Sequence, residues 1–154
     1  MSQHRWNWLL CGAVVLALAT AANSAISGTK DDDDEIGPRG GPVAEWKDYH
    51  AEFTVDHATK TATIYILDSK LKDIKIAPAK ITKAKLTITS VKPEVAIELK
   101  YDAKLSGDKL TVFVGTNDVL GKKADLEGTI GATIGKKAYE SDFKFEVKKR
   151  AKAK

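Results

Sequence analysis

The sequence predicts an all-β protein, built as a single antiparallel β-sandwich of seven or eight short strands. From residue 43 to residue 147 the apolar residues recur with a period of two, which is the period of a half-buried strand. Turn-forming residues interrupt this pattern about every ten residues, and no segment has the periodicity of a helix. Within this class we expect an immunoglobulin-like topology, and a small closed β-barrel is the alternative that the same pattern allows.

Seven segments carry the strand pattern. Four of them alternate between an apolar and a polar face, namely 49–56, 95–102, 126–134 and 143–147. Two others, 61–67 and 110–114, are apolar on both faces, and we expect them to be central strands. Segment 81–90 completes the set, with Leu86 and Ile88 directed inward.

Turn chemistry separates these strands. Residues 56–60 are predicted to join the first long strand to the second as a hairpin, and Ser106-Gly107-Asp108 is the tightest turn signal. Gly128 and Gly131 lie inside a predicted strand, where glycine indicates a bulge or a close contact between strands.

The first twenty-five residues have the plan of a secretory signal peptide. Arg5 precedes an apolar core at 9–19, and small residues follow at 20–25. The apolar run of about fifteen residues is shorter than the roughly twenty that cross a bilayer, so we expect a cleaved signal, no stable membrane span afterwards, and a periplasmic or secreted protein. Cys11 is the only cysteine, so cleavage leaves a chain without disulfides or thiolate chemistry.

The remaining chain divides into three parts. Residues 26–40 hold the acidic run 31–35 and several glycines, and this composition predicts an acidic flexible linker. The β-sandwich domain is predicted over 41–148, and residues 149–154 form a basic disordered tail.

The chain carries a net charge of +4, and its lysines are spread out rather than clustered with aromatic residues. This distribution argues against nucleic-acid binding. The basic tail is interpreted first as a solvated chain end, and weak attraction to an anionic surface or an envelope protein is the functional alternative; we expect a monomer.

Catalytic patterns are weak in this sequence. None of the serines at 69, 90, 106 and 141 lies in a Gly-x-Ser-x-Gly elbow, and no glycine-rich phosphate loop precedes a helix. We therefore expect a protein that is not an enzyme, and a secreted hydrolase is the least favoured alternative.

Two sets of residues are candidate sites. His50 and Glu52 share one face of a predicted strand, and His57 lies in the following turn, so these three are candidate ligands for a divalent metal. Otherwise they are polar surface, and no other cofactor is predicted. Thr116, Asn117 and Asp118 lie in a polar loop bounded by glycines and form a candidate binding loop, for which an Asx-type turn is the alternative interpretation.

The sequence also resembles a family of small uncharacterised exported bacterial β-domains, which is associated with heavy-metal efflux adaptor proteins. The matching motifs are Gly40-Gly41, Tyr49–Phe53, Thr61–Asp68, Gly115–Asp118 with Leu120-Gly121, and Tyr139 with Ser141–Lys144. The similarity spans about residues 40–146. In that family a histidine often precedes the glycine pair and often replaces Asn117. Here Pro38-Arg39 and Asn117 stand instead, and these departures count against metal binding.

The functional prediction is therefore an exported, non-catalytic binding or accessory module of the periplasm or cell envelope. The alternative that the resemblance implies is a periplasmic metal-binding accessory protein linked to heavy-metal efflux.

Overall fold

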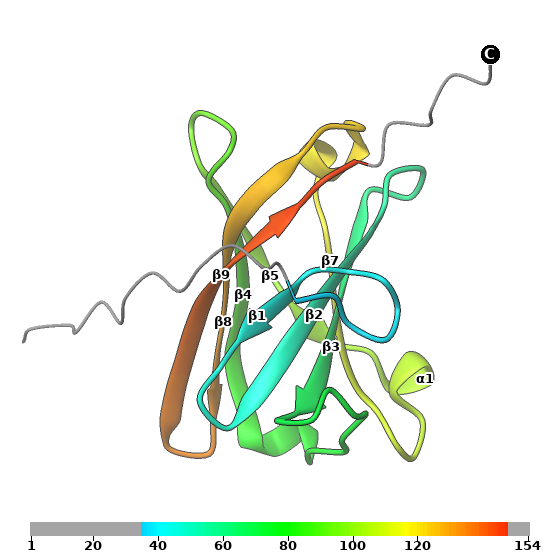
Figure 1. Cartoon of the computed structure of the whole chain (residues 1–154), viewed down its shortest axis with the longest axis vertical. Coiled ribbons are helices and arrows are strands. Elements are labelled where there is room, and N and C mark those ends of the chain that lie inside the picture. Colours follow the sequence, from blue (N-terminus) through cyan, green and yellow to red (C-terminus); the bar gives the residue numbers. More distant parts are fainter. Residues whose placement is uncertain (1–34, 148–154) are drawn as a thin grey trace, which may run out of the picture. The chain divides into compact units, whose positions relative to one another are not determined.

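The computed structural model describes residues 35–147 and confirms the two-sheet β-sandwich (Figure 1). The first sheet contains β1 (Val43–Glu45), β2 (Tyr49–Asp56), β3 (Thr61–Asp68), β6 (Lys100–Tyr101) and β7 (Thr111–Thr116). The second sheet contains β4 (Ile81–Ile88), β5 (Val95–Glu98), β8 (Leu126–Ile134) and β9 (Lys137–Phe145). The predicted signal peptide, linker residues 26–34 and the basic tail lie outside the described residues.

The strand order is that of an immunoglobulin-like sandwich. The first sheet has the order β1-β2-β3-β7-β6 and the second has the order β5-β4-β8-β9, with every pair antiparallel. Strands β2, β3, β7 and β6 correspond to strands A, B, E and D of that fold, and β5, β4, β8 and β9 correspond to C′, C, F and G. Strand β1 is an addition beside A. The two sheets do not close on each other, so the alternative of a small barrel is wrong.

Most strand predictions hold, and the exceptions have local causes. The predicted strand 95–102 is divided between β5 and β6, because the chain crosses from one sheet to the other at the buried residue Leu99. Strand β9 begins six residues earlier than predicted, since its first half carries exposed polar residues that hide the alternation. The three-residue strand β1 was missed because it is too short to show a period.

Three short helical turns connect the strands in the described region: η1 (Pro78–Lys80), α1 (Ala103–Ser106) and η2 (Asp118–Gly121). Sequence periodicity missed α1, which is a single turn. Asp102 begins it by accepting hydrogen bonds from the backbone N–H groups of Lys104 and Leu105, both at 2.9 Å. Gly107 ends it with φ = +49°, within the turn that the sequence predicted.

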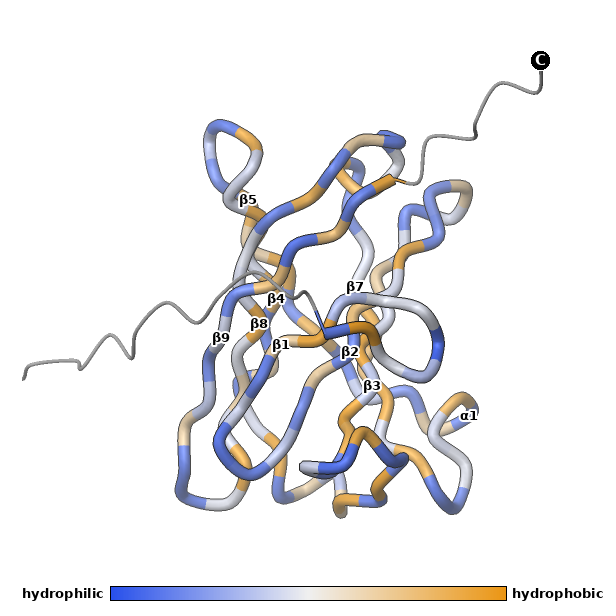
Figure 2. The backbone as a smooth tube through the Cα atoms, viewed as in Figure 1, coloured by the Kyte–Doolittle hydropathy of each residue, from blue (hydrophilic) through white to orange (hydrophobic). Residues whose placement is uncertain are grey.

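The core lies between the sheets and is built by the buried apolar residues of the strands. Figure 2 shows hydrophobic and hydrophilic residues following one another along the strands. Phe53 of β2 is fully buried, and its ring stacks on that of Phe143 from β9 with centroids 4.5 Å apart. Phe145 approaches Phe53 edge-on, with centroids 5.6 Å apart. These aromatic contacts join the two sheets across the core.

Two glycines behave as the sequence indicates. A side chain at Gly128 would collide with the backbone carbonyl oxygen of Thr87 on the neighbouring strand, so this position requires glycine. Opposite Gly131, strand β4 contains a bulge between Thr82 and Lys85.

An aromatic cluster closes the edge of the sandwich between β1 and β9. Trp46 stacks on Tyr139 at 5.6 Å, Tyr49 meets Tyr139 edge-on at 5.7 Å, and the Trp46 indole N–H donates to the Ile130 carbonyl at 3.3 Å. Asp48 accepts hydrogen bonds from the Tyr139 hydroxyl at 2.8 Å and from Lys137 Nζ at 2.9 Å. The turn between β1 and β2 is thereby attached to the second sheet.

We expect Phe53→Ala to lower the free energy of unfolding by about 3–5 kcal/mol, because it removes the ring that joins the sheets and leaves a cavity. Urea denaturation measures this change. Lys85→Ala, on the exposed face of β4, is the control and should shift stability by no more than about 0.5 kcal/mol. A similarly small effect of Phe53→Ala would contradict the described packing.

The Asp48 cluster predicts a pH dependence. Its hydrogen bonds from Lys137 and then Tyr139 hold the pKa of the Asp48 carboxyl below its ordinary value of 3.8. A carboxyl whose pKa is lower in the folded protein stabilises the fold above its unfolded pKa, and this contribution is lost as the pH falls through the folded value. We therefore expect Asp48→Asn to lower the melting temperature near neutral pH, with the difference from the unmodified chain shrinking at acidic pH as the lowered pKa of the Asp48 carboxyl is passed. An equal difference at neutral and acidic pH would refute this role.

Candidate functional site

Glu52 is the one charged residue in the described part of the chain whose side chain is completely buried. It alternates with the inward residues Ala51 and Phe53, so it points to the outer face of the first sheet, where the preceding segment 36–42 covers it. Its Oε1 accepts hydrogen bonds from the backbone N–H groups of Arg39 at 2.6 Å and Gly41 at 3.2 Å. The sequence analysis predicted an exposed position for Glu52, and this was wrong. Strand periodicity predicts which side chains share a face, but it does not predict that a separate segment covers that face.

The Arg39 side chain completes this cluster. Its Nη1 donates to Glu52 Oε2 at 3.3 Å, and its Nη2 donates to Asp73 Oδ1 at 2.6 Å. The guanidinium carbon lies 3.9 Å from the centre of the Tyr65 ring, in a cation–π contact. Burial opposes the charge on Arg39, but the hydrogen bonds to Asp73 and Glu52 outweigh it and raise the pKa of the guanidinium. Arg39 thus ties segment 36–42 to β3 and to the connection that contains Asp73.

Residues 36–40, which the sequence assigned to the flexible linker, are therefore part of the folded domain. Ile36 forms a bridge with Pro42, and the backbone N–H of Gly37 donates to the Gly41 carbonyl at 2.8 Å. A side chain at Gly37 would collide with the Glu52 side chain, so the turn requires glycine at this place. The glycines that suggested flexibility instead permit a tight turn over a buried carboxylate.

The two histidines lie at opposite ends of β2. His50 pairs with Leu67 near the beginning of the strand, whereas His57 follows its last residue. His50 Nδ1 lies 3.0 Å from the Asp68 carbonyl oxygen, and His57 Nδ1 lies 2.7 Å from that of Leu120. Because a carbonyl oxygen only accepts, each ring carries a proton on Nδ1. Both rings are thus held by the backbone.

The structure does not bring the three candidate metal ligands together. His50 and Glu52 share a face as predicted, but the Glu52 carboxylate already neutralises the Arg39 guanidinium, and His57 is at the far end of the strand. Within residues 35–147 no group of three or more His, Cys, Asp or Glu side chains is placed to hold a metal ion.

The candidate binding loop is a well-supported turn. Asn117 Oδ1 accepts a hydrogen bond from the Val119 N–H at 3.0 Å and caps η2, which is the Asx-type turn of the alternative interpretation. Asp118 forms an ion pair with Lys60 at 2.7 Å, and Thr116 is exposed at the end of β7. Val119 and Leu120 are buried and anchor the turn to the core.

A groove of about 350 Å³ lies between β5 and β7, beside the place where the chain crosses from one sheet to the other. It is lined by Ala96, Ile97, Glu98, Lys100, Val114, Gly115, Thr116 and Asn117. Two of the three predicted loop residues therefore face a concave surface. The residues of β5 were missed, since the sequence shows one continuous strand where the chain changes sheets.

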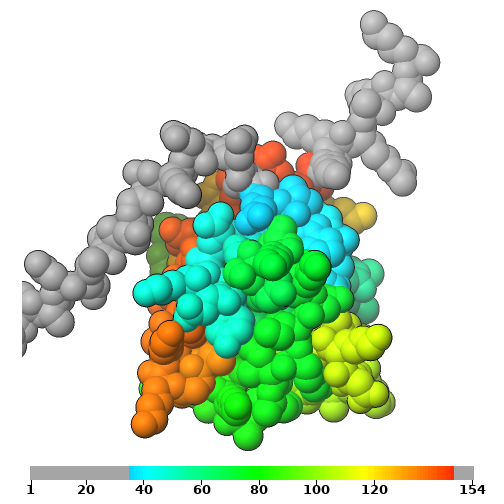
Figure 3. Space-filling model, turned by 60° about the horizontal axis from the view of Figure 1, so that its bottom comes forward, coloured from blue at the N-terminus to red at the C-terminus, as the bar shows by residue number. Residues whose placement is uncertain are grey.

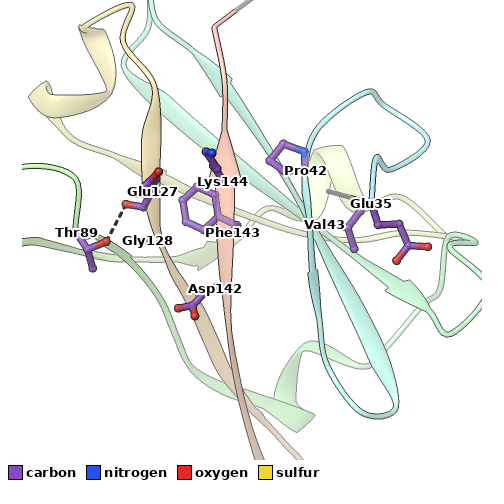
Figure 4. A pocket seen from close by; sticks show the side chains of 9 residues that line it. All are labelled: Glu35, Pro42, Val43, Thr89, Glu127, Gly128, Asp142, Phe143 and Lys144. Atoms are coloured by element: carbon purple, nitrogen blue, oxygen red, sulfur yellow. Dashed lines mark hydrogen bonds between the residues drawn. The ribbon is translucent and has the colours of Figure 1, made fainter. Parts of the chain in front are cut away.

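A second depression of about 370 Å³ lies at the opposite edge, between β1 and β9 (Figure 4). Its walls carry the carboxylates of Glu35, Glu127 and Asp142, and Lys144 lies beside them. Figure 4 shows Glu35 on the β1 side of the depression and Asp142 on the β9 side, pointing away from each other. The acidic groups are therefore not gathered at one point.

No family model, curated protein or solved structure matches this chain. The similarity to exported domains associated with metal efflux thus stays a prediction. Of the helices in residues 35–147, none has the length and apolar character needed to cross a membrane.

We expect Arg39→Ala to destabilise the fold by about 2 kcal/mol, because it leaves the buried Glu52 carboxylate with only its backbone donors. Chemical denaturation measures this effect. The double variant Arg39→Ala/Glu52→Gln should recover part of the loss, since a neutral amide is cheaper to bury than an unpaired charge. Equal stabilities of Arg39→Ala and the unmodified chain would show that the cluster is not a stabilising element.

Proposed function

We propose that the protein is an exported, non-catalytic binding module of the periplasm or cell envelope, and that it binds an extended peptide segment of a partner protein. The observation that carries this proposal is the groove between β5 and β7, which contains Thr116 and Asn117 of the candidate loop. The signal-like first twenty-five residues support export.

The groove offers strand edges that lack partners. Strand β6 pairs with β7 only at Lys100–Val114 and Tyr101–Phe113, so pairing on that side of β7 stops before Gly115. Strand β5 is the edge strand of the second sheet and pairs only with β4. An unpaired edge presents backbone N–H and C=O groups that an extended peptide can complete as an added strand.

The floor of the groove is fixed. Gly115 is buried, and a side chain at this position would come within 2.7 Å of Ile97 Cγ2 and 3.1 Å of the Glu98 carbonyl oxygen. Glycine therefore lets β7 approach the crossing between β5 and β6 closely. A peptide would find a preformed surface there, with Glu98 and Lys100 exposed on its rim.

The other free edge of the sandwich is less suited to strand addition. Strand β9 carries exposed charged residues along its length, namely Lys137, Glu140, Asp142 and Lys144. Charges of this kind protect an edge strand against pairing with another chain. Residues 114–116 of β7 carry no charge, so the groove between β5 and β7 is the better place for an added strand.

The polar side chains most suited to chemistry have structural partners, and this supports a non-catalytic role. Both imidazole Nδ1 atoms bond to backbone carbonyls, and Ser106 is buried with its Oγ accepting from the Val112 N–H at 2.9 Å. The Glu52 carboxylate is held by Arg39. These groups serve the fold, so we assign function to a surface rather than to a reactive centre.

We expect peptides selected from a displayed random library to bind in this groove. On the isotopically labelled chain, they should shift the amide resonances of residues 95–98 and 114–117. The variants Ala96→Arg and Thr116→Arg fill the groove and should weaken binding at least about tenfold.

Ala138→Arg, on the exposed beginning of β9, is the matched control and should bind as the unmodified chain does. Selected peptides that shift other residues, or that tolerate both groove variants, would overturn the proposal. So would the failure of the library to yield any binder.

A further inference from the structure

Four connections meet at one end of the sandwich, which we call the basic end: residues 46–48, 69–80, 102–110 and 135–136. The pairs Tyr49–Asp68 and Ile66–Thr111 bring the first three to the same end of the first sheet. The Gly135 N–H donates to the Lys80 carbonyl at 2.7 Å and brings the fourth beside them. Figure 3 brings this end forward, with the green 69–80 connection in the middle, the orange hairpin to one side and the yellow-green α1 region to the other.

The basic end is strongly enriched in lysine. Its four connections hold eight lysines and four aspartates. The connections at the opposite end, residues 57–60, 89–94 and 117–125, hold four lysines and three acidic residues. The positive charge of the domain is therefore concentrated at one end, although the lysines are dispersed along the sequence.

None of these eight lysines forms an ion pair with a residue in 35–147. Lys75 donates to the Tyr101 hydroxyl at 2.8 Å and to the Gly107 carbonyl at 2.6 Å. The other seven are exposed and form no ion pair with any residue in 35–147; they are Lys47, Lys70, Lys72, Lys80, Lys104, Lys109 and Lys136.

The aspartates of this end are mostly engaged elsewhere. Asp48 bonds to Lys137, Asp73 bonds to Arg39, and Asp102 caps α1. The backbone N–H groups of Lys72 and Lys70, and then the charges of these lysines, lower the pKa of Asp68 at the same end, but neither lysine forms an ion pair with it. The exposed ammonium groups are therefore available to an external anion.

A second observation, an exposed leucine at the same end, favours a lipid surface as the source of the anionic groups. Leu105 of α1 is 49 % exposed and is one of two large hydrophobic residues exposed in the described region. It follows Lys104 in α1, the turn that Figure 1 labels near this end of the sandwich. A soluble polyanion gives no reason to expose a leucine among lysines, whereas the boundary between lipid headgroups and acyl chains accommodates both.

We propose that the basic end docks on a bilayer that contains anionic phospholipids. The lysines contact the phosphate groups of the lipid headgroups, and Leu105 inserts between them. Each lysine near such a surface strengthens binding several-fold, and salt weakens the attraction because it screens exposed charges. This surface is separate from the groove between β5 and β7, so either proposal can fail without the other.

The test is sedimentation of the chain from Ile26 onward with vesicles of phosphatidylcholine, with and without phosphatidylglycerol. We expect binding only to the anionic vesicles, and its loss at about 1 M salt. Lys104→Gln/Lys109→Gln should weaken binding at least about tenfold. Leu105→Ser should weaken it several-fold while leaving the salt dependence in place.

Lys122→Gln/Lys123→Gln removes the same charge at the opposite end and is the matched control, with binding unchanged. Repeating the comparison of the two lysine pairs in a chain that lacks residues 149–154 distinguishes vesicle binding by the basic end from vesicle binding by the basic tail. Equal effects of the two lysine pairs, or loss of all vesicle binding with the tail, would overturn the proposal. The ligand would be a soluble polyanion rather than a membrane if the protein bound soluble dextran sulfate but not vesicles. In that case Leu105→Ser should leave the binding to dextran sulfate unchanged.

Discussion

The buried carboxylate of Glu52 is the constraint around which the outer face of the first sheet is organised. A charge removed from water needs hydrogen bonds and a counter-charge, and segment 36–42 supplies both through two backbone N–H groups and the Arg39 guanidinium. The same guanidinium reaches Asp73, so the connection that forms the middle of the basic end is attached to the beginning of the domain. One buried charge thereby fixes two segments that strand pairing leaves outside the sheets.

The crossing of the chain at Leu99 has a comparable effect at the other edge. Because β5 and β6 belong to different sheets, the chain crosses between the sheets beside β7, and the groove lies next to this crossing. Gly115 lets β7 lie close to Ile97 and Glu98 at the floor of the groove. The turn capped by Asn117 holds the end of β7 against the core. The groove thus lies where the chain of this immunoglobulin-like sandwich connects strand C′ (β5) to strand D (β6).

The two proposed surfaces use different physical chemistry and lie on different parts of the molecule. The groove offers backbone groups and small side chains, which suit an extended peptide. The basic end offers exposed ammonium groups around one leucine, which suit a lipid surface. Taken together, the two proposals would make this domain a module that links a protein segment to a membrane.

The sequence by itself determined most of the strands, most of the turns and the all-β class, because alternation of side chains is a local property that burial of one face imposes on a strand. It also offered the Asx-type turn at Asn117 as one interpretation of that loop and indicated the close strand contact at Gly128. Only the tertiary structure decided that Glu52 is buried, that the segment 95–102 changes sheets, and that dispersed lysines gather at one end. These features depend on contacts between residues that are distant in the sequence, such as Arg39 and Asp73. The periodicity of a single segment carries no information about such contacts.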